Sequence, residues 1–123
     1  PCRPPRPPAS TLNFAAGQII ANMVMVPVGG GNTVTFYTNS GTVHLIADLV
    51  GYYPAGTCSG FTGIAPTRVL DTRTGLGAPK AKRAPSRTLT LTIPGLPAGT
   101  TSVAIHVTVA NTTQCEDTRV GHE

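Results

Sequence analysis

Residues 17–53 read GQIIANMVMVPVGGGNTVTFYTNSGTVHLIADLVGYY and contain three apolar segments, residues 18–28, 33–38 and 43–53. Short runs of Gly, Asn and Ser separate these segments, and connections of this length favour antiparallel hairpins. The sequence therefore predicts a three-stranded β-meander. In the third segment the alternation predicts one well-buried face, made of Val43, Leu45, Ala47 and Leu49.

The composition of the 123-residue chain is typical of a β protein. Charged residues make up 11%, Gly occurs 14 times and Pro 12 times, and helix-forming residues at a 3.6-residue period are missing. The length suits one domain with a single core. We therefore predict an all-β fold, an antiparallel β-sandwich that is Ig-like or jelly-roll-like, with little or no helix. No segment approaches the roughly twenty apolar residues that span a bilayer.

Further strands are predicted outside the first stretch. Residues 88–93 alternate Thr with Leu or Ile, which places the threonines toward solvent. Residues 102–110 alternate as well, with His106 on the face opposite the valines. Two short apolar pieces flank Pro66 and are predicted as separate strands. The chain from residue 75 to 86 has no periodicity and is predicted to be an exposed loop.

The first apolar segment is long for a single strand. Residues 18–28 would extend over about 36 Å at about 3.3 Å per residue, so we expect a bend or bulge near Asn22. Pro27 cannot donate to a ladder, and we expect it at a sheet edge or a strand end.

Composition suggests three parts of the chain. Residues 1–9 are rich in Pro and predict an extended lead-in, with a Pro-rich recognition ligand as the alternative. Residues 10–113 are predicted to form one β-sandwich domain, whose halves, residues 10–54 and 60–113, are joined by a Gly/Ser-rich link. Residues 114–123 are predicted to form a polar tail.

The three cysteines, Cys2, Cys58 and Cys115, are candidates for a disulfide. One bridge with one thiol left over is compatible with an oxidising compartment, and the sequence leaves all three pairings open. Their spacing is not that of a metal site, and we expect no cofactor.

The net charge of +4 is concentrated in one region. This region contains one anion, Asp71, and six cations: Arg68, Arg73, Lys80, Lys82, Arg83 and Arg87. Clustered Lys and Arg attract anions, so an acidic wall polymer is a candidate ligand for the last five of these cations. Nucleic acid is not expected, because the loop lacks aromatic stacking residues.

Other candidate residues suggest binding more than catalysis. Tyr52 and Tyr53 are candidates for a sugar-binding face, since adjacent strand residues point to opposite sides. Asp71 is predicted to form a local ion pair or turn cap, with a weak calcium site as the alternative. His44 and Asp48 share a strand face but would lie about 13 Å apart, too far for a catalytic pair. We therefore expect a protein that is not an enzyme.

Two groups of motifs resemble a known family. PTRVLDTR at residues 66–73, followed by the alternating strand to Asn111, is similar to the first half of the β-rich repeat module of secreted actinobacterial surface proteins. STLNF at residues 10–14 and DLVGYY at residues 48–53 are similar to its second half. The halves occur here in reversed order, as if the chain joined the back of one repeat to the front of the next.

The resemblance implies a secreted, extracellular or cell-surface structural module, and it supplies no catalytic residue. We consider self-association or contact with neighbouring repeats, and the reversed order suggests filament assembly by strand exchange through residues 112–120. The plainer alternative is that the same segment completes the sheet of its own chain. A lectin-like module that binds carbohydrate or an anionic wall polymer, using the two tyrosines and the basic loop, is the alternative function.

Overall fold

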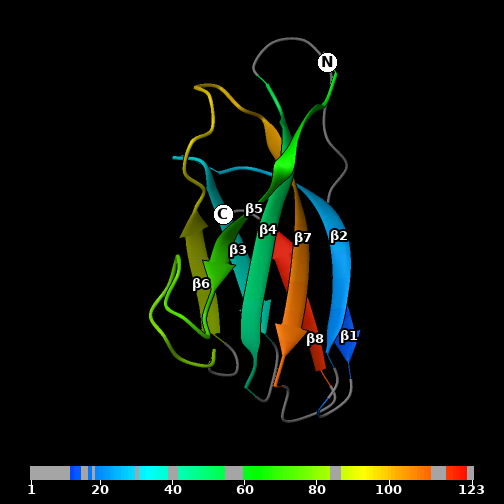
Figure 1. The fold of residues 1–123 in the computed structure, drawn as a ribbon, viewed down its shortest axis with the longest axis vertical. Coiled ribbons are helices and arrows are strands. Elements are labelled where there is room, and N and C mark those ends of the chain that lie inside the picture. Colours follow the sequence, from blue (N-terminus) through cyan, green and yellow to red (C-terminus); the bar gives the residue numbers. More distant parts are fainter. Residues whose placement is uncertain are drawn as a thin grey trace.

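Alternating apolar and polar residues produce two sheets, each with one face turned inward. The computed structural model describes residues 12–14, 17, 19–29, 31–38, 42–54, 60–83, 87–111 and 116–121. These residues form eight strands and no helix: β1 (Leu12–Phe14), β2 (Ile20–Pro27), β3 (Thr33–Thr38), β4 (His44–Tyr53), β5 (Thr62–Asp71), β6 (Arg87–Thr92), β7 (Ser102–Ala110) and β8 (Glu116–Gly121) (Figure 1).

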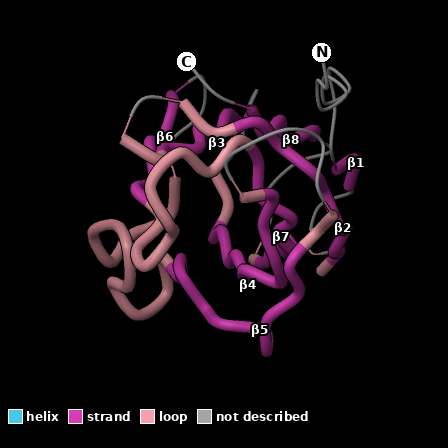
Figure 2. Tube along the Cα trace, turned by 90° about the horizontal axis from the view of Figure 1, so that it is seen from above, coloured by secondary structure: helices cyan, strands magenta, loops and turns pink. Residues whose placement is uncertain are grey.

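The strands form two four-stranded antiparallel sheets. We call them the β3 sheet, in the order β1-β8-β3-β6, and the β4 sheet, in the order β2-β7-β4-β5. Figure 2 shows the two layers from one end. The all-β sandwich is therefore confirmed, and this strand order is that of a jelly roll. Among the described residues no helix is long and apolar enough to cross a membrane.

Each strand of the first half of the chain pairs with a strand of the second half. β1 pairs with β8, β2 with β7, β3 with β6 and β4 with β5, and the contacts of β3 with β8 and of β4 with β7 complete the sheets. The molecule is thus one long antiparallel ribbon, rolled so that consecutive strands lie in different layers, except for β4 and β5, which form a hairpin within one sheet.

The predicted β-meander is wrong for this reason. β2 and β4 lie in one sheet and β3 lies in the other. The turn between β2 and β3 does close tightly, because the Gly29 N–H donates to the Thr33 carbonyl at 2.9 Å and Asn32 adopts φ 60°. Beyond that turn the strands separate into the two sheets, and the buried side chains of β2 and β3 meet across the core.

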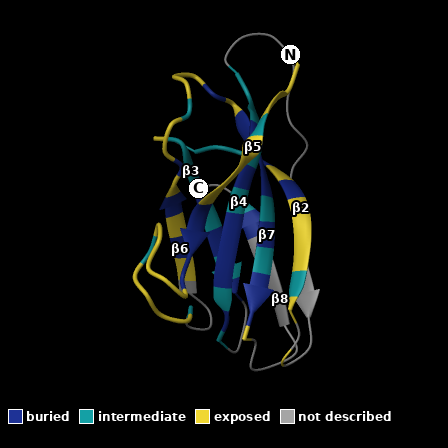
Figure 3. Ribbon diagram, in the orientation of Figure 1, coloured by how far each residue is buried: buried dark blue, intermediate teal, exposed yellow. Residues whose placement is uncertain are grey.

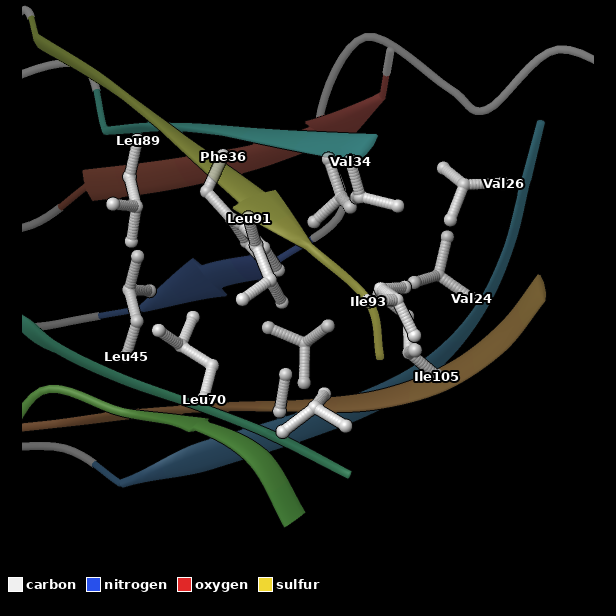
Figure 4. Close-up of a cluster of buried hydrophobic side chains, with 14 of the residues drawn as sticks. Val24, Val26, Val34, Phe36, Leu45, Leu70, Leu89, Leu91, Ile93 and Ile105 are labelled. Carbon is white, nitrogen blue, oxygen red and sulfur yellow. The ribbon is translucent and has the colours of Figure 1, made fainter. Parts of the chain in front are cut away.

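The core lies between the layers. Its fully buried members include Val26 from β2, Phe36 from β3, Leu45 from β4 and Ile105 from β7. Figure 4 shows side chains from both sheets meeting in this space. The predicted alternation is confirmed on β4, β6 and β7, where Figure 3 shows buried and more exposed residues along the same strands.

Two local predictions are wrong. β2 pairs with β7 without a register shift from Ile20 to Pro27, so Asn22 marks no bulge. The two pieces around Pro66 form a single strand, β5. β5 is an edge strand, and its pairing with β4 shifts register between Thr67 and Gly63, so the ladder does not need the missing Pro66 amide. Pro27, as expected, ends β2 at the opposite edge.

The predicted polar tail is largely a strand. Residues 116–121 form β8, which lies between β1 and β3 in the middle of its sheet. Val120 is opposite Phe36 and is buried. The single apolar residue of this segment predicts no strand by itself, but the alternative that the segment completes the sheet of its own chain is confirmed. The lead-in at residues 1–9, the link at residues 55–59 and the three cysteines lie outside the described residues.

Candidate functional site

Asp71 ends β5 and organises the turn that follows. Its carbonyl accepts the N–H groups of Thr74, Gly75 and Leu76, and its own N–H donates to the Leu76 carbonyl at 2.9 Å. Carboxylate Oδ1 accepts the Arg73 N–H and Nε, each at 3.0 Å, while Oδ2 accepts Arg73 Nη2 at 3.0 Å. The predicted ion pair and turn cap are therefore both present.

The charges around this turn are paired with one another. Hydrogen bonds from Arg73, with help from the nearby Arg68, hold the pKa of Asp71 below its usual value. Arg68 reaches Asp71 at 3.5 Å and also donates through Nε to Asp48 at 2.9 Å. The Asp71 carboxylate, which was considered as a calcium ligand, thus faces two guanidinium groups, and this favours the ion-pair interpretation. The described residues contain no cluster of three or more His, Cys, Asp or Glu that could hold a metal.

His44 is linked to the same turn through the buried Thr72. The Leu45 N–H donates to Thr72 Oγ1 at 3.0 Å, and that hydroxyl lies 2.9 Å from His44 Nδ1. The hydroxyl proton is then available for Nδ1, which would leave the imidazole proton on Nε2. Burial, followed by the charges of Lys82 and Arg73, lowers the pKa of His44. His44 therefore holds the turn against β4 as a neutral side chain at pH 7.

The predicted basic loop is exposed but anchored. The Ala81 N–H donates to the Thr72 carbonyl at 3.1 Å, and the Arg83 N–H donates to the Val43 carbonyl at 2.7 Å. Gly77 adopts φ 75°, and a Cβ there would clash with the Val69 carbonyl, so this position requires glycine.

Among the loop side chains that the structure describes, three cations remain after the ion pairs are assigned. Lys80 and Lys82 are exposed and Arg83 is half-buried, whereas the Arg73 guanidinium is engaged by Asp71. The side chain of Arg87 lies outside the described residues. We call Lys80, Lys82 and Arg83 the basic end of the molecule.

The two tyrosines lie at the opposite end of β4. β4 carries an extra residue, Val50, between Leu49 opposite Ile105 and Gly51 opposite Ala104. This bulge changes the side to which later residues point. Tyr52 consequently packs against the core, and only Tyr53 is left on the outer face.

Tyr53 lies against Phe61. No pattern in the sequence indicated Phe61 as a site residue. The two ring centroids are 5.4 Å apart and the planes are tilted by 60°. Phe61 is 44% exposed and its ring lies over Gly51, where a Cβ would clash with it. Tyr53 lies about 20 Å along β4 from the Asp71 turn, and Figure 1 shows the loop after β5 at the other end of the strand. The two tyrosines and the basic loop therefore do not lie side by side, and Tyr52 packs against the core.

Exposed apolar side chains gather on the β4 sheet. Met23 and Met25 on β2 are 52% and 37% exposed, Ile19 immediately before β2 is 71% exposed, and Phe61 precedes β5. We call Ile19, Met23, Met25 and Phe61 the apolar strip. Its sequence signal is that β2 is apolar on both faces, since buried Val24 and Val26 alternate with the methionines.

The register aligns these residues across the sheet. Met25 is opposite Ala104, which is opposite Gly51, so small residues separate Met25 from Phe61. In the adjacent row Met23 lies opposite His106, and His106 lies opposite Asp48. Asp48 in turn forms an ion pair with Arg68. This face can make apolar contacts at one edge and polar contacts along the middle.

Comparisons with protein-family models, with curated proteins and with solved structures found no match.

Proposed function

We propose that this chain is a non-catalytic structural or interaction module that contacts other protein surfaces through the apolar strip. The strip is the observation that carries the proposal. Large side chains such as Met23 and Phe61 are exposed although the inner face of the same sheet already supplies the core. Exposed large apolar residues that gather on one face favour a protein contact site.

A location outside the cell is part of the proposal. It rests on the resemblance of residues 66–73 and 48–53 to secreted surface modules and on the low content of charged residues. In the structure, Asp48, Arg68 and Asp71 from these motifs form one ion-paired group across β4 and β5. The motifs therefore have a structural role that a non-catalytic module would need.

The proposed contact does not require strand exchange. The segment considered for strand exchange, residues 112–120, includes most of β8. This strand pairs with β1 and β3 of its own chain. The module would then contact its partners without exchanging a strand with them.

Binding of an anionic polymer at the basic end is the second candidate function. Lys80, Lys82 and Arg83 lie on a loop that backbone hydrogen bonds hold to Thr72 and Val43. A fixed group of cations attracts polyanions with less loss of conformational entropy than a mobile loop would.

Sedimentation velocity of the full chain, together with a glycan and wall-polymer array, tests the proposed function. We expect concentration-dependent association and no binding to neutral glycans. A chain that remains monomeric at every concentration and binds a glycan would overturn the proposal in favour of a lectin-like role.

A further inference from the structure

The four edge strands of the sandwich differ in how well they are protected from pairing with another chain. β1 has only three residues, β5 has an irregular register and contains Pro66, and β6 exposes a row of threonines. Short length, bulges, prolines and polar side chains all discourage a further strand. β2 has eight residues and an even register, with Pro27 only at its end.

β2 is also uncharged and apolar on both faces. Its sequence is IANMVMVP, in which Val24 and Val26 face the core and Met23 and Met25 face outward. Among the described residues, no strand pairs with the side of β2 that faces away from β7. Regular apolar edges of this kind add a further strand by main-chain hydrogen bonding.

We propose that β2 pairs antiparallel with β2 of a second copy of this chain, joining the two β4 sheets into one continuous sheet. The inference rests on the proposed function and names its partner and its contact strand. A two-fold axis makes the contact self-complementary and leaves no open β2 edge in the dimer, so association would stop at two copies.

The distribution of charge favours a second copy. The chain carries +4, but its basic end adjoins β4 and β5, whereas β2 forms the other edge of the sheet (Figure 1). In the dimer the two β5 strands would be seven strand spacings apart, about 34 Å. This separation exceeds the Debye length of about 8 Å at physiological ionic strength, so the basic ends would barely repel each other.

The pleat restricts the register of the pairing. Residues that face outward must lie opposite residues that also face outward. Met23 would therefore lie opposite Met23 or Met25 of the second copy. A pair of charges introduced at these positions reports both the contact and its register.

Size-exclusion chromatography with light scattering on the full chain tests the inference. We expect wild type to shift from monomer to dimer with concentration. Met23→Lys should weaken the dimer about tenfold, because the introduced lysine would face either its own copy or the apolar Met25 across the pair. Thr90→Lys, an exposed position on the β6 edge, is the matched control and should dimerise as wild type does. Circular dichroism melts of both variants check that the fold is retained.

Mixing oppositely charged variants distinguishes loss of the β2–β2 contact from a general loss of folded protein. Met23→Lys mixed with Met23→Glu or with Met25→Glu should restore the dimer in the combination whose residues lie opposite. Association that persists in Met23→Lys would overturn β2 pairing while leaving the proposed function in place. Wild type that is monomeric at every concentration would overturn the β2 dimer and would also count against protein contact through the strip.

Discussion

The outer faces of the two sheets are built differently. On the β3 sheet, Thr33 lies opposite Thr92, Thr35 opposite Thr90 and Tyr37 opposite Thr88, so β3 and β6 present hydroxyl side chains on this face. On the β4 sheet the corresponding face contains Met23, Met25 and the Asp48–Arg68 ion pair. A sandwich needs only one apolar face on each sheet. The fold therefore does not require the apolar outer residues of the β4 sheet, and for this reason we assign them to the proposed contact.

Substitutions on the inner and outer faces should give the largest contrast. Leu91→Asp on β6 and Val107→Asp on β7 should each cost about 4 kcal/mol or more, because each buries an unpaired charge. Thr90→Asp, exposed beside Leu91, should change stability by no more than about 0.5 kcal/mol. Thermal melts that shifted equally for all three variants would contradict the assignment of the faces.

The close contact on the outer face of the β4 sheet predicts a second, smaller effect. Gly51→Ala should destabilise by about 1–3 kcal/mol, because its Cβ would meet the Phe61 ring and the Thr62 carbonyl. Gly63→Ala is a matched control, since its Cβ would lie at an ordinary 3.7 Å from Phe61. Urea denaturation measures both variants. Equal free energies of unfolding would show that Phe61 does not close over Gly51.

The ion pairs of this face predict a dependence on pH. Asp71 has a lowered pKa in the folded state, so its stabilisation is complete above the pKa of an unfolded Asp and is lost as the pH falls through the folded value. Asp71→Asn should cost about 1–3 kcal/mol at pH 7. Urea denaturation of both chains should show this difference shrinking below about pH 4. A difference that is constant from pH 7 to pH 3 would contradict the role of the Asp71 charge.

The basic end should matter least for stability. Replacing Lys80, Lys82 and Arg83 together by Gln should change the free energy of unfolding by less than about 1 kcal/mol, since exposed charges contribute little. Retention on an immobilised polyanion such as dextran sulfate should fall if this end binds anionic polymers. Retention that does not change with salt or with the substitution would remove the basic end as a binding site.

Local patterns in the sequence predicted which residues face the core. The alternation of Leu89, Leu91 and Ile93 with threonines, and of the valines on β7 with His106, needs no knowledge of the partner strands. The Asp71 turn was predictable for the same reason, because its partner Arg73 is two residues away.

The pairing of strands could not be predicted from the same patterns. A short Gly-rich connection allows either a hairpin within one sheet or a crossing between sheets, and the choice depends on partners far along the chain. The β4 bulge shows the same limit at the site. An extra Val50 leaves no mark in the sequence, yet it turns Tyr52 into the core and leaves Tyr53 to meet Phe61.

The rolled ribbon has a consequence for how the chain folds. Every ladder among the eight strands joins a strand before residue 54 to one after residue 60, so neither half contains a ladder of its own. β4 and β5 meet across the shortest connection, whereas Leu12 must find Thr118. Because closing long loops costs entropy, pairing should begin at β4 and β5 and spread outward. If the chain were cut between residues 55 and 59, each of the two fragments would be unfolded alone. The fragments would fold only when they bind each other, as the halves of a split protein do.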